Sequence, residues 1–187
     1  MSKIWLTSDT HFGHDREFIW GPRGFSAVWE NDDTIIKNWN ELVQPDDEVY
    51  HLGDVILGDN ASGIKKLKSL KGNIHIIRGN HDTPARLALY SDCYNVVEVC
   101  DAKWLKYSGL NFYLSHFPTM TSNLDKSDSL KQHILNLYGH THQKTNFYEQ
   151  IPFMYHVGVD SHNCKPILID DIIKDIEKEA ENCKKYL

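Results

Sequence analysis

The sequence lacks any uninterrupted apolar run of the roughly 18 residues that a membrane-spanning helix requires. Residues 1–6 also lack the basic, apolar and small-residue pattern of a signal peptide, and we therefore expect a cytoplasmic chain. Acidic residues outnumber basic ones, and the formal net charge is -6. That charge argues against binding to a nucleic acid polymer or to an acidic membrane surface.

Cysteine is scarce as well, with four residues in the whole chain. None of them forms a C-x-x-C pair, which is the spacing that a zinc knuckle needs. The spacing does not indicate a disulfide framework either, and we expect reduced, structural thiols of the kind found in cytosolic proteins. The four residues are Cys93, Cys100, Cys164 and Cys183.

The chain contains no internal repeat, no low-complexity segment and no linker rich in proline, glycine and serine. Its 187 residues fit one domain, and 41% hydrophobic with 25% charged residues is the balance of a soluble globular protein. We therefore expect a single domain over residues 1–187. Nothing in the pattern indicates a particular oligomeric state.

Short apolar runs alternate with amphipathic stretches in the first half of the chain. This pattern predicts strands at 3–7, 48–52 and 73–77, with helices at 33–43 and 64–70 between them. A β-α-β-α-β order is typical of a parallel sheet with helical crossovers. The second half is richer in strands, which we expect at 95–99, 103–107, 110–115, 134–138, 153–157 and 166–169, before a final helix at 171–185.

Polar side chains that can hold a metal ion follow five of the predicted strands. They are Asp9 and His11, Asp54, Asn80 and His81, His116, and finally His140 and His142. Sites in open α/β sheets lie beyond the carboxyl ends of the strands, because the loops there converge on one crevice. Glycines and small residues adjoin these groups, and glycine allows the backbone to turn sharply and to come close to an ion. We therefore expect these side chains to meet.

The types of these residues indicate which ions they would hold. Carboxylate, amide oxygen and imidazole suit Mn, Fe, Zn, Ni or Co, whereas a closed structural zinc site uses cysteine thiolates. Asp9 and His11 stand two residues apart, as do His140 and His142, so in extended chain both members of each pair point to the same side. Asp54 can bridge two cations through its two oxygens. We expect two divalent ions, with manganese as the first choice.

The ordered motifs resemble those of the calcineurin-like metallophosphoesterases. The five blocks occur in the family order over residues 9–142. This resemblance implies an α/β fold with a four-layer sandwich of two mixed β-sheets flanked by helices. It also implies that Asp9, His11 and His142 hold the first metal, that Asp54 bridges, and that Asn80, His116 and His140 hold the second. By the same resemblance His81 protonates the leaving oxygen or stabilises charge there, and its neighbour Asp82 can orient it.

The function that follows is hydrolysis of a small phosphoester by a metal-bridging hydroxide, with His81 assisting departure of the alcohol. We favour a diester slightly, because a short chain without a cap domain leaves a site that can admit both ester arms. The sequence is similar to a compact bacterial and phage branch of the superfamily. A second hypothesis is a catalytically silent scaffold that binds a protein partner; such a scaffold is free to lose His81 or Asp54, and here neither is lost.

Several further residues have two interpretations. His14 can contact substrate phosphate or be an ordinary exposed histidine. Arg23 can grip a phosphate with two hydrogen bonds or be a solvated loop residue. Asp160 and His162 can approach the crevice or be parts of a polar turn, and we favour the turn. Arg78 can support the site or pair with a nearby acid, and we favour the pairing.

Overall fold

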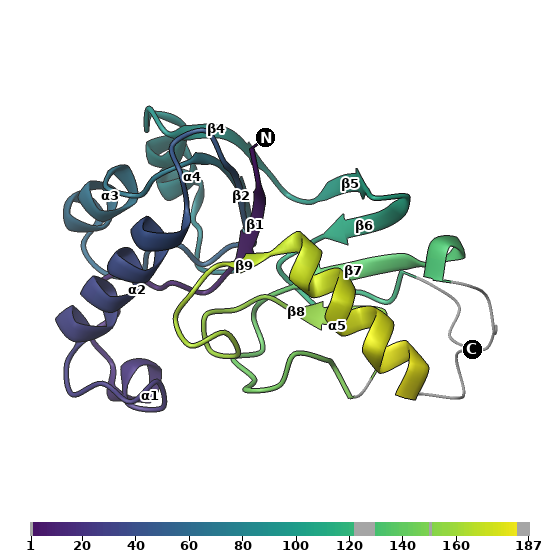
Figure 1. Ribbon diagram of the computed structural model, residues 1–187. Coiled ribbons are helices and arrows are strands. Elements are labelled where there is room, and N and C mark those ends of the chain that lie inside the picture. Colours follow the sequence, from purple (N-terminus) through teal and green to yellow (C-terminus); the bar gives the residue numbers. More distant parts are fainter. Residues whose placement is uncertain (1, 122–129, 150, 183–187) are drawn as a thin grey trace.

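The computed structural model describes residues 2–121, 130–149 and 151–182 and contains two β-sheets with helices around them. Figure 1 shows helices α2, α3 and α4 gathered beside the first sheet, on the side away from the second sheet. The described part of the chain has no helix with the length and apolar character needed to cross a membrane.

The first sheet contains five strands in the order β4-β3-β2-β1-β9. Their bounds are Ile4–Thr7 (β1), Glu48–His51 (β2), Asn73–Ile77 (β3), Val96–Cys100 (β4) and Ile167–Leu168 (β9). Strands β1 to β4 run parallel, and β9 pairs antiparallel with β1. Thr7 lies beside His51, and His51 lies beside Ile76, so the first three strands end together at one edge of the sheet.

Three helices cover the outer face of this sheet. They are α2 (Val28–Leu42), α3 (Asn60–Lys68) and α4 (Pro84–Ser91). Trp39, Leu67 and Tyr90 from these helices are buried in one cluster with Val49 and Ile74 of the sheet. Burial of large apolar and aromatic side chains is the main stabilising contribution to such a layer.

The second sheet contains four strands in the order β5-β6-β7-β8. Their bounds are Lys103–Tyr107 (β5), Leu110–Leu114 (β6), Ile134–Tyr138 (β7) and Met154–His156 (β8). Strands β5 and β6 form a hairpin, while β6, β7 and β8 run parallel. The hairpin turns at Ser108 and Gly109, both of which have positive φ, as a two-residue hairpin turn requires.

The two sheets face each other across a second core. Leu52 and Ile77 from the first sheet edge pack in one cluster with Phe112 and Leu137 of the second sheet. Helix α5 (Ile169–Asn182) adds its apolar stripe of Ile169, Ile172 and Ile176 to the same cluster. Two mixed sheets flanked by helices were expected, and this part of the prediction is confirmed.

The structure differs from the expected elements mainly in its helices. Helix α2 begins at Val28, five residues before the predicted start, without a side-chain cap to signal that start. Helix α4 was not predicted, although Thr83 caps it and Pro84 stands at its first turn, which are recognised start signals. The four-residue helix α1 (Glu17–Trp20) was also missed, because one turn shows no periodicity. Residues 183–185 of the predicted last helix lie outside the described residues.

Candidate metal centre

The predicted ligands follow the carboxyl ends of β1, β2, β3, β6 and β7, and the loops there lie against one another. The backbone N–H of His140 donates to Asp9 Oδ2 at 3.0 Å, although 131 residues separate the two along the chain. His116 Nδ1 lies 2.8 Å from the carbonyl oxygen of Leu52, which joins the second sheet to the first. The structure therefore brings the ends of both sheets together at one place.

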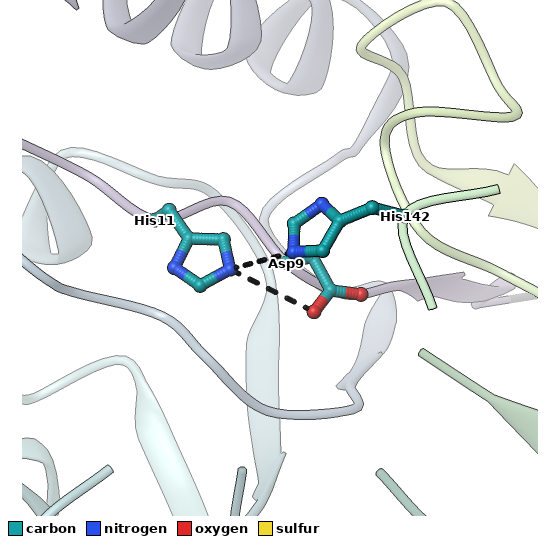
Figure 2. Close-up of side chains that lie close together, drawn as sticks. All are labelled: Asp9, His11 and His142. Atoms are coloured by element: carbon teal, nitrogen blue, oxygen red, sulfur yellow. Dashed lines mark hydrogen bonds and ion pairs between the residues drawn. The ribbon is translucent and has the colours of Figure 1, made fainter. Parts of the chain in front are cut away.

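Asp9, His11 and His142 form the first cluster, in which one ligand atom of each residue lies within 4.8 Å of the others. Figure 2 shows the His11 ring facing both the His142 ring and the Asp9 carboxylate. His11 Nε2 lies 3.2 Å from His142 Nε2 and 3.9 Å from Asp9 Oδ1. Two ligands held about 2.0–2.2 Å from one ion lie about 3 Å apart, so this spacing fits a coordination shell.

A second cluster forms around Asn80, and Asp54 lies between the two. Asn80 Oδ1 lies 2.8 Å from His116 Nε2 and 2.9 Å from His140 Nδ1. Asp54 Oδ2 lies 3.6 Å from His11 Nε2 on one side and 3.6 Å from His116 Nε2 on the other. This carboxylate oxygen is thus equally distant from a ligand of each cluster, which is the position that a bridging group needs.

The protonation of His116 tests whether a cation fits here. The Leu52 carbonyl can only accept, so His116 Nδ1 carries the hydrogen and donates it. In a neutral ring Nε2 then carries a lone pair, and it faces Asn80 Oδ1, another acceptor, at 2.8 Å. With the amide oxygen of Asn80 turned toward it, this lone pair and that oxygen converge on one point, as two ligands of one cation do. The residues therefore fit a metal ion, and the absence of sulfur from the cluster suits a hard or intermediate ion.

The backbone at these ligands adopts an uncommon conformation. Asp9, His11, Asp54, His140 and His142 have positive φ values between 48° and 68°. The left-handed region costs a non-glycine residue roughly 1–2 kcal/mol. Strain of this kind persists where the surrounding structure enforces it, and it concentrates at functional sites. These residues face one another because the loops are held in this form.

Two glycines permit the close approach of these loops. A Cβ atom on Gly79 would lie 2.2 Å from Asp54 Oδ1, and a Cβ atom on Gly139 would lie 2.3 Å from Ser8 Oγ and 2.6 Å from Asp9 Oδ2. Any larger residue at either position would displace one of the two carboxylates.

Burial and charge set the protonation of the cluster. Burial raises the pKa of Asp54, because the ionised carboxylate loses its hydration. Burial also acts to raise the pKa of Asp9, but the imidazoles of His142 and His11 outweigh it and leave that pKa below its ordinary value. Burial holds the pKa of His11 well below its ordinary value, which favours the neutral ring that can ligate a metal.

His142 is oriented by an acid that sequence reasoning assigned to a polar turn. Asp160 Oδ2 accepts a hydrogen bond of 2.9 Å from His142 Nδ1, which leaves Nε2 directed at the cluster. Burial acts to lower the pKa of His142, but this hydrogen bond outweighs it and raises the pKa. A carboxylate bound to the far nitrogen of a ligating histidine fixes both its tautomer and its orientation. The favoured interpretation of Asp160 as part of a polar turn was therefore wrong, and the alternative, that Asp160 approaches the crevice, agrees with the structure.

Arg23 supports this acid instead of facing the crevice. Its side chain is only 1% exposed. Nε and Nη2 donate to the two carboxylate oxygens of Asp160 at 2.9 and 3.1 Å, Nη1 donates to Asn31, and Nη2 also donates to the carbonyl oxygen of Asp9. These contacts occupy the guanidinium, so the prediction that Arg23 grips a substrate phosphate does not agree with the structure. No short sequence motif could reveal this role, because its partner lies 137 residues away.

His81 lies at the mouth of the site, and Asp82 lies beneath it. The His81 side chain is 45% exposed, with Nε2 at 4.0 Å from Asp54 Oδ2. Asp82 was expected to orient His81, but its oxygens instead accept from the backbone of Asp54, Val55 and Gly79 and from the Tyr90 hydroxyl. That expectation was wrong. A buried carboxylate with four backbone and hydroxyl donors holds the loops after β2 and β3 together.

A crevice of about 650 Å³ opens above the ligands. His14 lies in its wall, with its ring 5.6 Å from the ring of His11, and contact of His14 with the substrate phosphate stays a prediction. Phe18, Ile19 and Leu57 form an apolar side of the same crevice. Sequence reasoning missed Phe18, and its position in an unpredicted helix explains why. Arg78, interpreted as pairing with an acid, lies 3.8 Å from Asp101 at the surface.

Comparison with known proteins identifies the family. The model of the calcineurin-like phosphoesterase superfamily domain matches residues 2–158. An uncharacterised protein of Methanocaldococcus jannaschii is 37% identical in an alignment of 186 residues that covers 95% of this chain and 93% of that protein.

Two solved structures share the fold. A protein of unknown function from Aquifex aeolicus has a TM-score of 0.67 at 23% identity, over 93% of this chain and 99% of that one. A phosphoesterase from E. coli has a TM-score of 0.50 at 17% identity, over 83% and 78% of the two chains. Together with the clustered aspartates and histidines, the family match over most of the length shows that the chain belongs to the calcineurin-like phosphoesterase superfamily of metal-dependent phosphoric ester hydrolases.

Proposed function

We propose that the protein hydrolyses small phosphodiesters with the help of two divalent metal ions. The observation that carries this proposal is the place of Asp54, whose Oδ2 lies 3.6 Å from a ligand nitrogen of each cluster. Asp9, His11 and His142 would hold one ion, and Asn80, His116 and His140 would hold the other, with Asp54 between them. The donor set suits Mn²⁺ and also Fe, Zn, Ni or Co.

Bound ions in this arrangement would lower the pKa of a water and neutralise charge on the phosphoryl oxygens. The chain itself would supply orientation and a proton. The backbone N–H of His81 donates to Asp54 Oδ1 at 2.8 Å, which ties the loop that carries His81 to the bridging carboxylate. The exposed His81 ring stands at the mouth of the crevice, where it would donate a proton to the departing ester oxygen.

The shape of the surface around Asn80 supports a diester. Asn80 lines the crevice above the ligands, which we name the first groove. It also lines a second groove of about 420 Å³ that Arg78, Phe117 and Thr119 border. A phosphate held at Asn80 would therefore have two grooves beside it, and each groove could take one ester arm. A monoester would use only one of them.

Turnover of two nitrophenyl esters tests this proposal. With Mn²⁺, we expect kcat/KM on bis(p-nitrophenyl) phosphate to exceed that on p-nitrophenyl phosphate by at least tenfold. Treatment with a chelator should abolish both activities, and Mn²⁺ should restore them. A preference for the monoester would overturn the diester assignment. Absence of any hydrolysis by protein that contains two bound ions would overturn the proposal as a whole and favour a scaffold role.

A further inference from the structure

An exposed aromatic ring lies beside the candidate metal centre but does not belong to the residues that would hold a metal ion. Phe18 is 70% exposed, although it lines the first groove. Its position is well fixed, because the next residue, Ile19, is buried and the backbone N–H of Gly21 donates to Glu17 to close the turn. An exposed phenylalanine held in place at the edge of a polar crevice is a surface suited to contact with a ligand.

Ring contacts place Phe18 one side chain beyond the ligands. The rings of His11 and His14 are 5.6 Å apart, and the rings of His14 and Phe18 are also 5.6 Å apart with their planes at 88°. His14 thus stands edge-on to Phe18 and spaces it from the metal ligand His11. A phosphate bound at the candidate metal ligands would be too far from Phe18 to touch it. A group joined to that phosphate through a spacer about as wide as the His14 ring would reach Phe18.

The charges in the first groove restrict what that group can be. Among the described residues, its lining contains no lysine or arginine, and its side beyond the ligands consists of Phe18, Ile19 and Leu57. A second phosphate or a carboxylate would find no lysine or arginine in that lining, and the guanidinium of Arg86 beside it already donates to the carbonyl oxygens of His81 and Gly58. A flat, uncharged ring would find an aromatic face, and stacking of one base on one aromatic side chain contributes about 1–3 kcal/mol.

We propose that Phe18 is a specificity-determining residue that stacks on the heterocyclic base of a nucleoside ester, so that the substrates are nucleotide phosphodiesters. This inference rests on the proposed function, since the phosphate must lie at the ligands for the base to reach Phe18. The sugar then spans His14, and the base lies on the exposed face of Phe18. His81, which lines the same groove, faces the nucleoside arm.

Calorimetric titration of the Mn²⁺-loaded protein tests this inference with three probes: adenosine 5′-monophosphate, ribose 5-phosphate and inorganic phosphate. We expect the nucleotide to bind about tenfold more tightly than the sugar phosphate, which differs from it only by the base. Phe18→Ala should reduce this ratio to about one, and Phe18→Trp should keep or increase it. Because both affinities depend equally on the phosphate and on the metal ions, a general change in phosphate or metal binding leaves their ratio unchanged. Tyr94→Ala removes another exposed aromatic ring outside both grooves and should leave the ratio as it is.

The outcomes separate this inference from the proposed function. If all three probes bind with equal affinity, or if Phe18→Ala retains the preference for the nucleotide, the role of Phe18 is disproved while phosphoester hydrolysis stands. If none of the three probes binds, the role of Phe18 is disproved; if the metal-loaded protein also hydrolyses no bis(p-nitrophenyl) phosphate, the proposed function fails with it.

Discussion

The floor and the rim of the crevice differ in how the chain constrains them. The residues of the floor are at most 2% exposed; they are Asp9, His11, Asp54 and His116. The backbone of the first three has positive φ, and hydrogen bonds from both sheets hold Asp9 and His116 in place.

The rim, formed by His14, Phe18, His81 and Phe117, stands in or near solvent on loops and on one short helix. Under the proposed function, the metal ions would lie at the floor, while the rim would supply the proton of His81 and the contacts that select the substrate. Loops on a rigid scaffold can vary without loss of the centre that they surround.

The largest effect should come from the floor. Replacing Asp54 by Asn removes the charge that lies between the two clusters, so at least one ion should be lost. We expect activity on bis(p-nitrophenyl) phosphate to fall at least about 10³-fold. Elemental analysis of the purified variant should find fewer than two ions per chain. Asp46→Asn makes the same chemical change in an exposed turn and should alter neither property.

His81→Ala tests whether the rim supplies a proton, because the loss of activity should then depend on how much the leaving group needs one. A departing alkoxide needs a proton, whereas nitrophenolate leaves readily without one. The loss in kcat should therefore be about 10²–10⁴-fold for an alkyl ester and less than about tenfold for a nitrophenyl ester. The bound metal should stay unchanged, because His81 Nε2 is directed into the crevice mouth at 4.0 Å from Asp54. Equal losses on both esters would argue against a role as proton donor.

A smaller effect should follow when the support beneath the floor is weakened. Asp160→Asn keeps an acceptor for Arg23 but removes the carboxylate that orients His142. The affinity for one ion should fall about 10–100-fold, while the other site is affected less. Titration of the metal-free protein with Mn²⁺ would measure the affinity of each of the two sites. Asp171→Asn, at an exposed position in α5, serves as the matched control.

Sequence pattern predicted the floor better than the rim and its supports. The candidate ligands follow strands, and parallel strands that end together carry their loops to one place, so a pattern of strand ends was enough to predict that these side chains lie close together. Asp82 and Arg23 were assigned to the wrong partners, because side-chain hydrogen bonds join loops whose relative positions no local pattern encodes. Phe18 was missed because a single helical turn has no periodicity.

The close contact between Gly139 and Ser8 has a consequence for how the molecule unfolds. With no room for even a methyl group between Gly139 and Ser8, the end of the second sheet rests directly on the end of the first. The first sheet also contributes to both hydrophobic cores, with Trp5 in one and Leu6 in the other, so loss of either core should weaken the other. We expect one cooperative transition upon heating, in spite of two separate cores.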